Sequence, residues 1–160
     1  MLSIQISDIK DFMSHLLSKD TFDHFYFIEA SIKMGVSYQI QGRINEGFYD
    51  TSVEQTLNRE FCYWKEIRHR IFDIIKGKRL PLSCKIVLGL SKQSISYLIA
   101  HNNSSFREED IEGIYVNILY DPKNLLITTG ISYKNFSLDK SLEYAFDEYL
   151  VNAFYRMEKM

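Results

Sequence analysis

Residues 26–44, YFIEASIKMGVSYQIQGRI, alternate apolar and polar side chains on both sides of Gly35. The apolar members are Tyr26, Ile28, Ala30, Ile32, Met34, Val36, Tyr38, Ile40 and Ile44. Alternation with a period of two places one set of side chains on one face of a strand, and a strand buried on both faces would not alternate. Because Gly35 can turn the chain, the stretch predicts an antiparallel hairpin with one face on the core and one in water.

Outward from this hairpin, the chain predicts the same order of elements twice. Residues 2–76 and 82–157 each give a strand, a helix, two hairpin strands and a longer helix. The longer helices, at about 60–76 and 139–158, each carry one apolar stripe. We therefore predict an α+β fold of duplicated β-α-β-β-α units, with an antiparallel sheet and helices packed on its apolar face.

One spacing recurs in both halves. Gly42 precedes Phe48 by six residues, and Gly130 precedes Phe136 by six. The repeat rests on element order more than on residue identity, so chance similarity of two ordinary halves is the alternative explanation.

The bulk composition bounds the class of protein. The chain has 160 residues, of which 46% are hydrophobic and 14% aromatic, and this excludes a mainly disordered chain. Its length is that of about one domain, so we expect residues 1–160 to share one core. The formal net charge of −2 predicts no strong overall attraction to nucleic acid or to an anionic membrane. No apolar run approaches membrane-spanning length, so no membrane partner is expected.

Segments outside the predicted core elements carry few signals. Residues 1–12 contain no basic segment followed by an apolar run, so no signal peptide is predicted. Residues 45–60 are polar and predict a loop, in which Thr51 and Glu54 have the capping-box spacing that opens a short helix.

The cysteines and histidines do not form a recognisable site. Cys62 and Cys84 lack the close spacing of a zinc or redox motif, so we expect two buried free thiols and a reducing cytoplasm. No HxxxH, HExxH or CxxC motif is present, so no metal site is predicted. Without a GxGxxG or phosphate-loop signature, no cofactor is predicted either.

The densest charge bias lies in residues 65–79, where six cations face two anions. The cations are Lys65, Arg68, Arg70, Lys76, Lys78 and Arg79. One interpretation is an edge that contacts nucleic-acid phosphates or another anion without reading sequence. The other is ordinary surface electrostatics, because cations near a helix C-terminus interact favourably with its dipole and its last carbonyls. The second interpretation is the commoner one for a cluster at one helix end.

Most of the aromatic residues fall on stripes that predict core packing. Phe25 and Phe27 are exceptions, because the alternation places them with Glu29 and Lys33 on the wet face of the hairpin. They predict either a contact surface or a second packed layer.

The sequence gives only weak evidence for a catalytic site. Asp11 and His15 stand four residues apart on a predicted helix, which could seat a carboxylate–imidazole pair. No nucleophile follows from the sequence, and an exposed ion pair is the commoner meaning of this spacing. An enzyme would need a site assembled from distant residues, such as Asp11, His15 and Tyr133.

Four blocks carry a resemblance to a known family: SDIKDFMSHLL, DTFDHFYFIEASI, IKGKRLPLSCKIVLGLS and TTGISYKNFSLDKSLE. Through nearly its whole length the chain resembles an uncharacterised bacterial family, a domain of unknown function. The resemblance implies no activity and no site residues. It does imply that the IKGKR and TTGISYKNF segments are family features.

A second resemblance concerns shape alone. The predicted order of strand, helix and hairpin, repeated with pseudo-symmetry, is similar to the half-domains of DNA sliding clamps. The long helices at 60–76 and 139–158 depart from that pattern, and a 160-residue chain would have to oligomerise to encircle DNA. Fold analogy supports no function by itself.

These observations favour a non-catalytic cytoplasmic binding or interaction protein, since no convergent set of nucleophile, base and oxyanion donors can be named. Its partner would be a protein or a nucleic acid, and a homo-oligomer is compatible with the sequence. The first alternative is a nucleic-acid-associated, clamp-like accessory factor that uses the six cations of residues 65–79. The weaker alternative is an enzyme of unidentified reaction.

Overall fold

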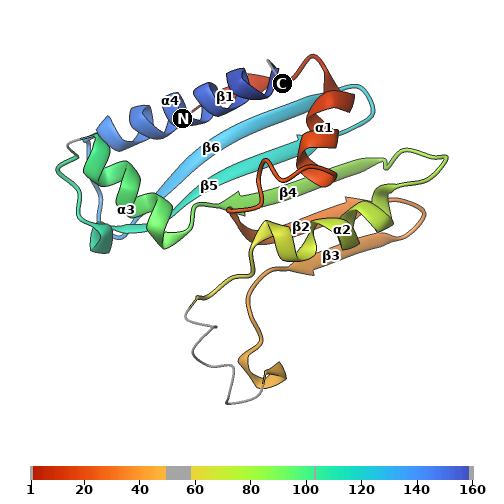
Figure 1. Ribbon diagram of the computed structural model, residues 1–160, viewed down its shortest axis with the longest axis horizontal. Coiled ribbons are helices and arrows are strands. Elements are labelled where there is room, and N and C mark those ends of the chain that lie inside the picture. The colour runs from red at the N-terminus through yellow and green to blue at the C-terminus, as the bar shows by residue number, and fades with distance from the viewer. Residues whose placement is uncertain (1, 50–58, 103, 159–160) are drawn as a thin grey trace.

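In the part of the chain that the structure describes, every strand pair is antiparallel and six strands form one sheet in the order β1-β6-β5-β4-β2-β3. The computed structural model describes residues 2–49, 59–102 and 104–158 (Figure 1). The strands are β1 (Ser3–Gln5), β2 (Tyr26–Lys33), β3 (Ser37–Gln41), β4 (Ser83–Gly89), β5 (Ile111–Tyr120) and β6 (Leu125–Tyr133). The helices are α1 (Ile9–Leu17), α2 (Trp64–Ile75), α3 (Lys92–His101) and α4 (Ser141–Glu158). The predicted α+β class and antiparallel sheet are confirmed.

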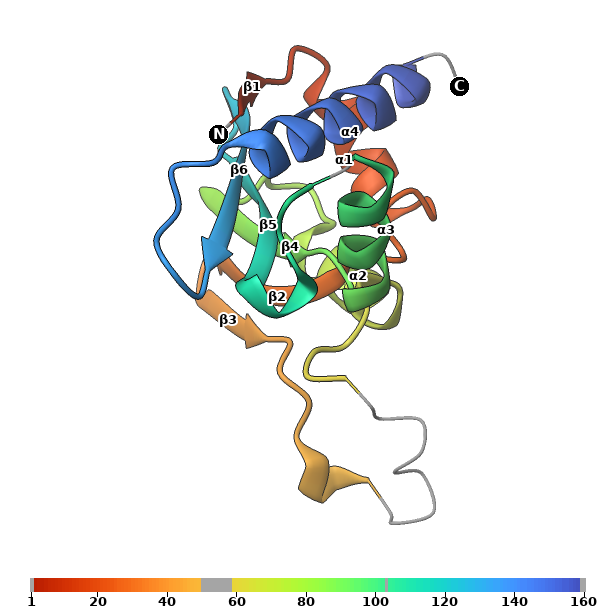
Figure 2. The ribbon, with the colours of Figure 1, turned by 90° about the vertical axis from the view of Figure 1, so that its left-hand side faces the viewer.

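The four helices lie on one side of the sheet (Figure 2). On that side the strands contribute fully buried side chains such as Ile86, Ile114, Ile118 and Ile127. On the opposite face most neighbouring positions are exposed or half-buried, as at Lys85 and Leu119, although Val87 of β4 is buried. One-sided coverage is the reason why the strands read as alternating sequences rather than continuous apolar runs. Within the described part of the chain, no helix is long and apolar enough to cross a membrane.

The start of β2 departs from strict alternation. Its register with β4 shifts between Phe27 and Glu29, so Ile28 is an extra residue in a β-bulge. The bulge moves Phe27 onto the same face as Ala30 and Ile32, and its side chain is fully buried. Strict alternation, without a bulge, predicts Phe27 on the solvent-exposed face of the hairpin.

Phe25 and Phe27 therefore do not form an exposed contact surface. Phe25 precedes β2 and is 3% exposed, and Phe27 packs against Trp64 with ring centroids 5.7 Å apart. Of the two interpretations of these residues, the structure supports the packed layer, because α2 covers this part of the sheet.

The β-α-β-β-α order occurs twice, but the two halves pair their strands differently. In the second half β4 pairs with β5, the strand that follows its helix. In the first half β1 does not pair with β2 but lies at the far edge against β6. The two landmark glycines also differ, because a Cβ on Gly42 would lie 1.8 Å from the carbonyl oxygen of Phe27, whereas a Cβ on Gly130 would meet open space. Duplication remains a prediction.

The two longer helices are shorter than predicted. Helix α2 begins at Trp64 because the Glu66 carboxylate accepts a hydrogen bond from the Tyr63 backbone N–H at 2.6 Å, which closes the first turn. Arg59 holds that carboxylate from the other side through two bonds of 2.6 and 2.9 Å, and lowers its pKa. Helix α4 begins at Ser141. The short helix predicted at Thr51–Glu54 lies outside the described residues.

We expect Gly42→Ala to lower the free energy of unfolding by about 1–3 kcal/mol, because its Cβ would overlap the Phe27 backbone. Gly130→Ala is the matched control, since open space surrounds that position. It should change stability by no more than about 0.5–1 kcal/mol, and a gain is expected where alanine replaces glycine in a strand. Urea denaturation followed by circular dichroism measures both values. Equal effects of the two substitutions would contradict the packing described for Gly42.

Candidate docking groove

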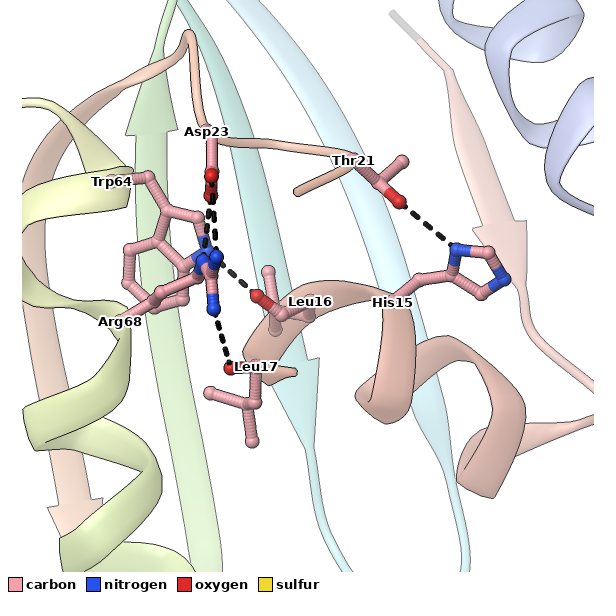
Figure 3. A network of polar contacts seen from close by, with 7 residues as sticks. All are labelled: His15, Leu16, Leu17, Thr21, Asp23, Trp64 and Arg68. Carbon is pink, nitrogen blue, oxygen red and sulfur yellow. Dashed lines mark hydrogen bonds and ion pairs between the residues drawn. The ribbon is translucent and has the colours of Figure 1, made fainter. Parts of the chain in front are cut away.

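Helix α1 is held against α2 by a buried hydrogen bond. The indole Nε1 of Trp64, the single tryptophan, donates to the carbonyl oxygen of Leu16 at 2.7 Å (Figure 3). The carbonyls of the last turn of a helix have no partner within the helix, so this bond satisfies a group that burial would otherwise leave unpaired. Both Trp64 and Leu16 are fully buried.

Arg68, one turn further along α2, makes a second set of contacts to the same region (Figure 3). Its guanidinium binds the Asp23 carboxylate through two bonds, Nε–Oδ1 at 2.6 Å and a second at 3.2 Å. It also donates to the Leu17 carbonyl at 3.4 Å. Asp23 accordingly raises the pKa of Arg68. Two-point binding of a planar guanidinium fixes orientation as well as charge, so Arg68 serves the fold at this position.

His15 is buried in α1, with 1% of its surface exposed. Its Nδ1 lies 2.9 Å from the Thr21 hydroxyl, as Figure 3 shows, and its Nε2 lies 3.4 Å from the Lys19 ammonium and 3.9 Å from the Asp11 carboxylate. Both ring nitrogens therefore have a polar neighbour close to α1. The imidazole is thus engaged in holding the turn after α1.

The structure does not bring Asp11 and His15 to Tyr133. The chain leading into α1 bonds at Leu125, the first residue of β6, whereas Tyr133 is the last residue of that strand. Eight strand residues separate the two places by about 26 Å. The Tyr133 ring packs on Phe106, and its buried hydroxyl has no hydrogen-bond partner among the described residues. These three residues do not form a catalytic set.

Helix α1 and the end of α2 also border an open apolar groove. The groove has a volume of about 560 Å³ and lies between α1, the end of α2 and the segment that leads into β4. Its apolar lining includes Ile9, Met13, Phe72, Ile75, Leu80 and Pro81. Leu80 is 67% exposed and Phe72 is 38% exposed, so much of the lining faces solvent. Gly77 lines the groove at the end of α2, where its φ of 148° is one that a residue with a Cβ rarely adopts.

The charged side chains that line this groove are cationic. Lys10 on α1 and Lys76 at the end of α2 stand on opposite walls, and no aspartate or glutamate occurs among the described lining residues. Lys76 lies 3.0 Å from Asp73 in an exposed ion pair and 6.0 Å from the centre of the Phe72 ring. Exposed pairs of this kind are weak, so Lys76 can exchange its partner at low cost.

The structure does not gather the six predicted cations on one surface. Arg68 is bound to Asp23, and Lys65 lies at the first turn of α2, about 16 Å along the helix from Lys76. Arg70 is exposed about 140° around the helix from Lys65. Lys78 and Arg79 are exposed beyond the helix end, next to the groove. Contact with nucleic acid remains a prediction for these residues.

Sequence reasoning missed the groove, although two signals mark it. Phe72 is an apolar residue of α2 that lies off the core-facing stripe formed by Trp64, Ile67, Ile71 and Ile74. Leu80 follows the basic segment directly, lines the groove and is 67% exposed. Apolar side chains outside a core stripe indicate a contact surface when they lie together.

The remaining candidate groups supply no chemistry. Both cysteines are unpaired; Cys62 is half-buried, and burial raises the pKa of the Cys84 thiol to about 12. Thiols of this kind are poor nucleophiles. Across residues 2–49, 59–102 and 104–158, no three His, Cys, Asp or Glu side chains are grouped so that they could hold a metal ion.

The fold and the groove define a small α+β protein with an open apolar surface. The model of a family of unknown function, DUF5721, matches residues 15–160, so the chain belongs to this family. The match confirms the resemblance to an uncharacterised domain. No curated protein and no solved structure matches the chain.

We expect Trp64→Phe to lower the free energy of unfolding by about 2–4 kcal/mol, because it leaves the Leu16 carbonyl buried without a donor and opens a cavity. Tyr97→Phe removes a polar group from an exposed aromatic residue of α3 and should change stability by less than about 0.5 kcal/mol. Denaturant titration followed by circular dichroism compares them. A Trp64→Phe protein as stable as the control would contradict the role given to the indole N–H.

Proposed function

We propose that this protein is a non-catalytic interaction protein that binds a short, acidic amphipathic segment of a partner protein in the groove between α1 and α2. The observation that carries the proposal is an apolar groove whose charged lining residues, Lys10 and Lys76, are both cationic. We further propose a cytoplasmic location, which the two unpaired cysteines support.

The shape of the groove suits a helical segment. An amphipathic helix presents apolar anchors at i, i+3, i+4 and i+7, and such anchors fit a groove walled by two helices. Burial of one leucine-sized anchor contributes about 1.5–3 kcal/mol, so several anchors together with the charged contacts have to offset the cost of association. Acidic residues beside the anchors would lie near Lys10 and Lys76, and they would set the orientation and speed the encounter.

A nucleic-acid partner finds less support in the geometry. Neutralising several phosphates requires several cations along one path, and Arg68 is already bound to Asp23 while Lys65 and Arg70 point to different sides of α2. An apolar lining is also of little use to a phosphate backbone. The protein-binding proposal uses both the apolar and the cationic part of the same surface.

Two synthetic peptides with the same apolar spacing test this proposal, one with glutamate and one with lysine at the remaining positions. We expect the acidic peptide to bind more tightly in a fluorescence polarisation titration. In ¹H–¹⁵N spectra it should shift the signals of residues 9–18 and 72–82. Leu80→Ser should weaken the acidic peptide at least about tenfold without loss of stability, because Leu80 is 67% exposed.

Charge reversal provides the matched control. Lys10→Glu combined with Lys76→Glu should reverse the preference between the two peptides. Lys33→Glu combined with Lys85→Glu, at exposed positions of the sheet, changes net charge equally and should leave the preference intact. Absence of binding by both peptides, or spectral changes outside the groove, would refute the proposal.

A further inference from the structure

The sheet has two edges, and they differ in how well they could accept another strand. Strand β1 at one edge is only three residues long, Ser3–Gln5. Strand β3 at the other edge runs over Ser37–Gln41 and pairs only with β2 (Figure 1). A short edge strand resists further pairing, whereas a longer one presents a row of unpaired backbone groups.

The hydrogen bonds at both ends of the hairpin show which backbone groups of β3 face outward. The Gly42 N–H donates to the Ile28 carbonyl at 2.8 Å, and the Met34 N–H donates to the Val36 carbonyl at 3.0 Å. Bonded and non-bonded pairs alternate in an antiparallel ladder, so Tyr38 and Ile40 also bond to β2. The N–H and C=O groups of Ser37, Gln39 and Gln41 therefore point away from it. Among the described residues, none donates a backbone hydrogen bond to them or accepts one from them.

The side chains of β3 provide none of the usual protection of an edge. Proteins block edge strands with lysine, proline or a bulge, and Ser37–Gln41 contains no charged residue, no proline and no register shift. Val36 and Tyr38 beside this edge are 65% and 38% exposed. The edge is therefore both open in its backbone and neutral in its side chains.

We propose that β3 pairs antiparallel with β3 of a second copy of this chain, about a two-fold axis at Gln39, and that the two sheets join into one. In this register Gln39 faces Gln39 of the other copy, and Ser37 faces Gln41. In each pair the free backbone N–H and C=O groups of one strand face those of the other strand. The hydrogen-bonding groups of both edge strands are thereby satisfied. The interface is independent of the groove between α1 and α2.

Side chains in this register are complementary. Tyr38 lies opposite Ile40 of the other copy, and aromatic and β-branched side chains pair favourably across strands. Arg43, the nearest charged residue along this edge, lies opposite Gly35, where there is no side chain, so two like charges do not meet. A second copy is the occupant this edge fits, because this register pairs Tyr38 with Ile40 and brings no two like charges together.

Charged substitutions at Gln39, the residue on the proposed two-fold axis, test the proposal. The wild-type protein should show a concentration-dependent monomer–dimer equilibrium in sedimentation analysis. Gln39→Lys alone and Gln39→Glu alone should each be monomeric, because like charges would face each other across the axis. An equal mixture of these two variants should restore the dimer. Gln39→Thr, which adds no charge, is the matched control and should dimerise like the wild type.

Hydrogen exchange locates the interface. The amide hydrogens of Ser37, Gln39 and Gln41 should be protected in the wild-type dimer and exchange rapidly in the Gln39→Lys monomer. Since Gln39 is exposed, the variants should share the wild-type unfolding midpoint at concentrations low enough for the wild type to be monomeric. A wild-type protein that stays monomeric at high concentration overturns the proposal. So does a Gln39→Lys protein that still dimerises, or a mixture of the charged variants that stays monomeric.

Discussion

The buried bond from the Trp64 indole to the Leu16 carbonyl joins two helices that are 48 residues apart in sequence. It satisfies a helix-end carbonyl that water cannot reach, so α1 and α2 can approach closely without leaving an unpaired polar group. Arg68 and Asp23 extend the same contact to the turn after α1. The position of α1 beside α2, and hence the width of the groove between these two helices, depends on these contacts. A groove built in this way is pre-formed, which lowers the cost of binding.

The second constraint is that the sheet is covered on one face only. Helices on a single side leave the strands alternating, and they leave the sheet with two open edges. The edge at β1 is short, and the edge at β3 is neutral and longer. The protein therefore offers two kinds of surface, a hydrophobic groove in the helical layer and an unpaired strand at the sheet edge.

Both surfaces consist mainly of apolar side chains and backbone groups. Two titratable groups that the sequence singled out have structural tasks, since Arg68 holds Asp23 and His15 contacts Thr21. Glu66, which the sequence did not single out, closes the first turn of α2. Membership in a family of unknown function is consistent with a site that no catalytic motif marks. A small protein that binds one partner in a groove and a second copy at an edge would present two grooves, and such bivalency raises avidity for a repeated partner.

The alternation of residues 26–44 and the helical stripes determined the antiparallel hairpin, the two long helices and the α+β class, because these patterns are local. Tertiary structure decided the rest. The bulge at Ile28, which carries Phe27 into the core, exists because the strand must fit β4 and α2 together. The apolar side chains of Phe72 and Leu80 indicate a contact surface, but the sequence does not show that α1 forms its other wall. The pairing of β1 with β6, and the use of Arg68 to hold Asp23, depend on contacts between residues far apart in the chain, which no local period encodes.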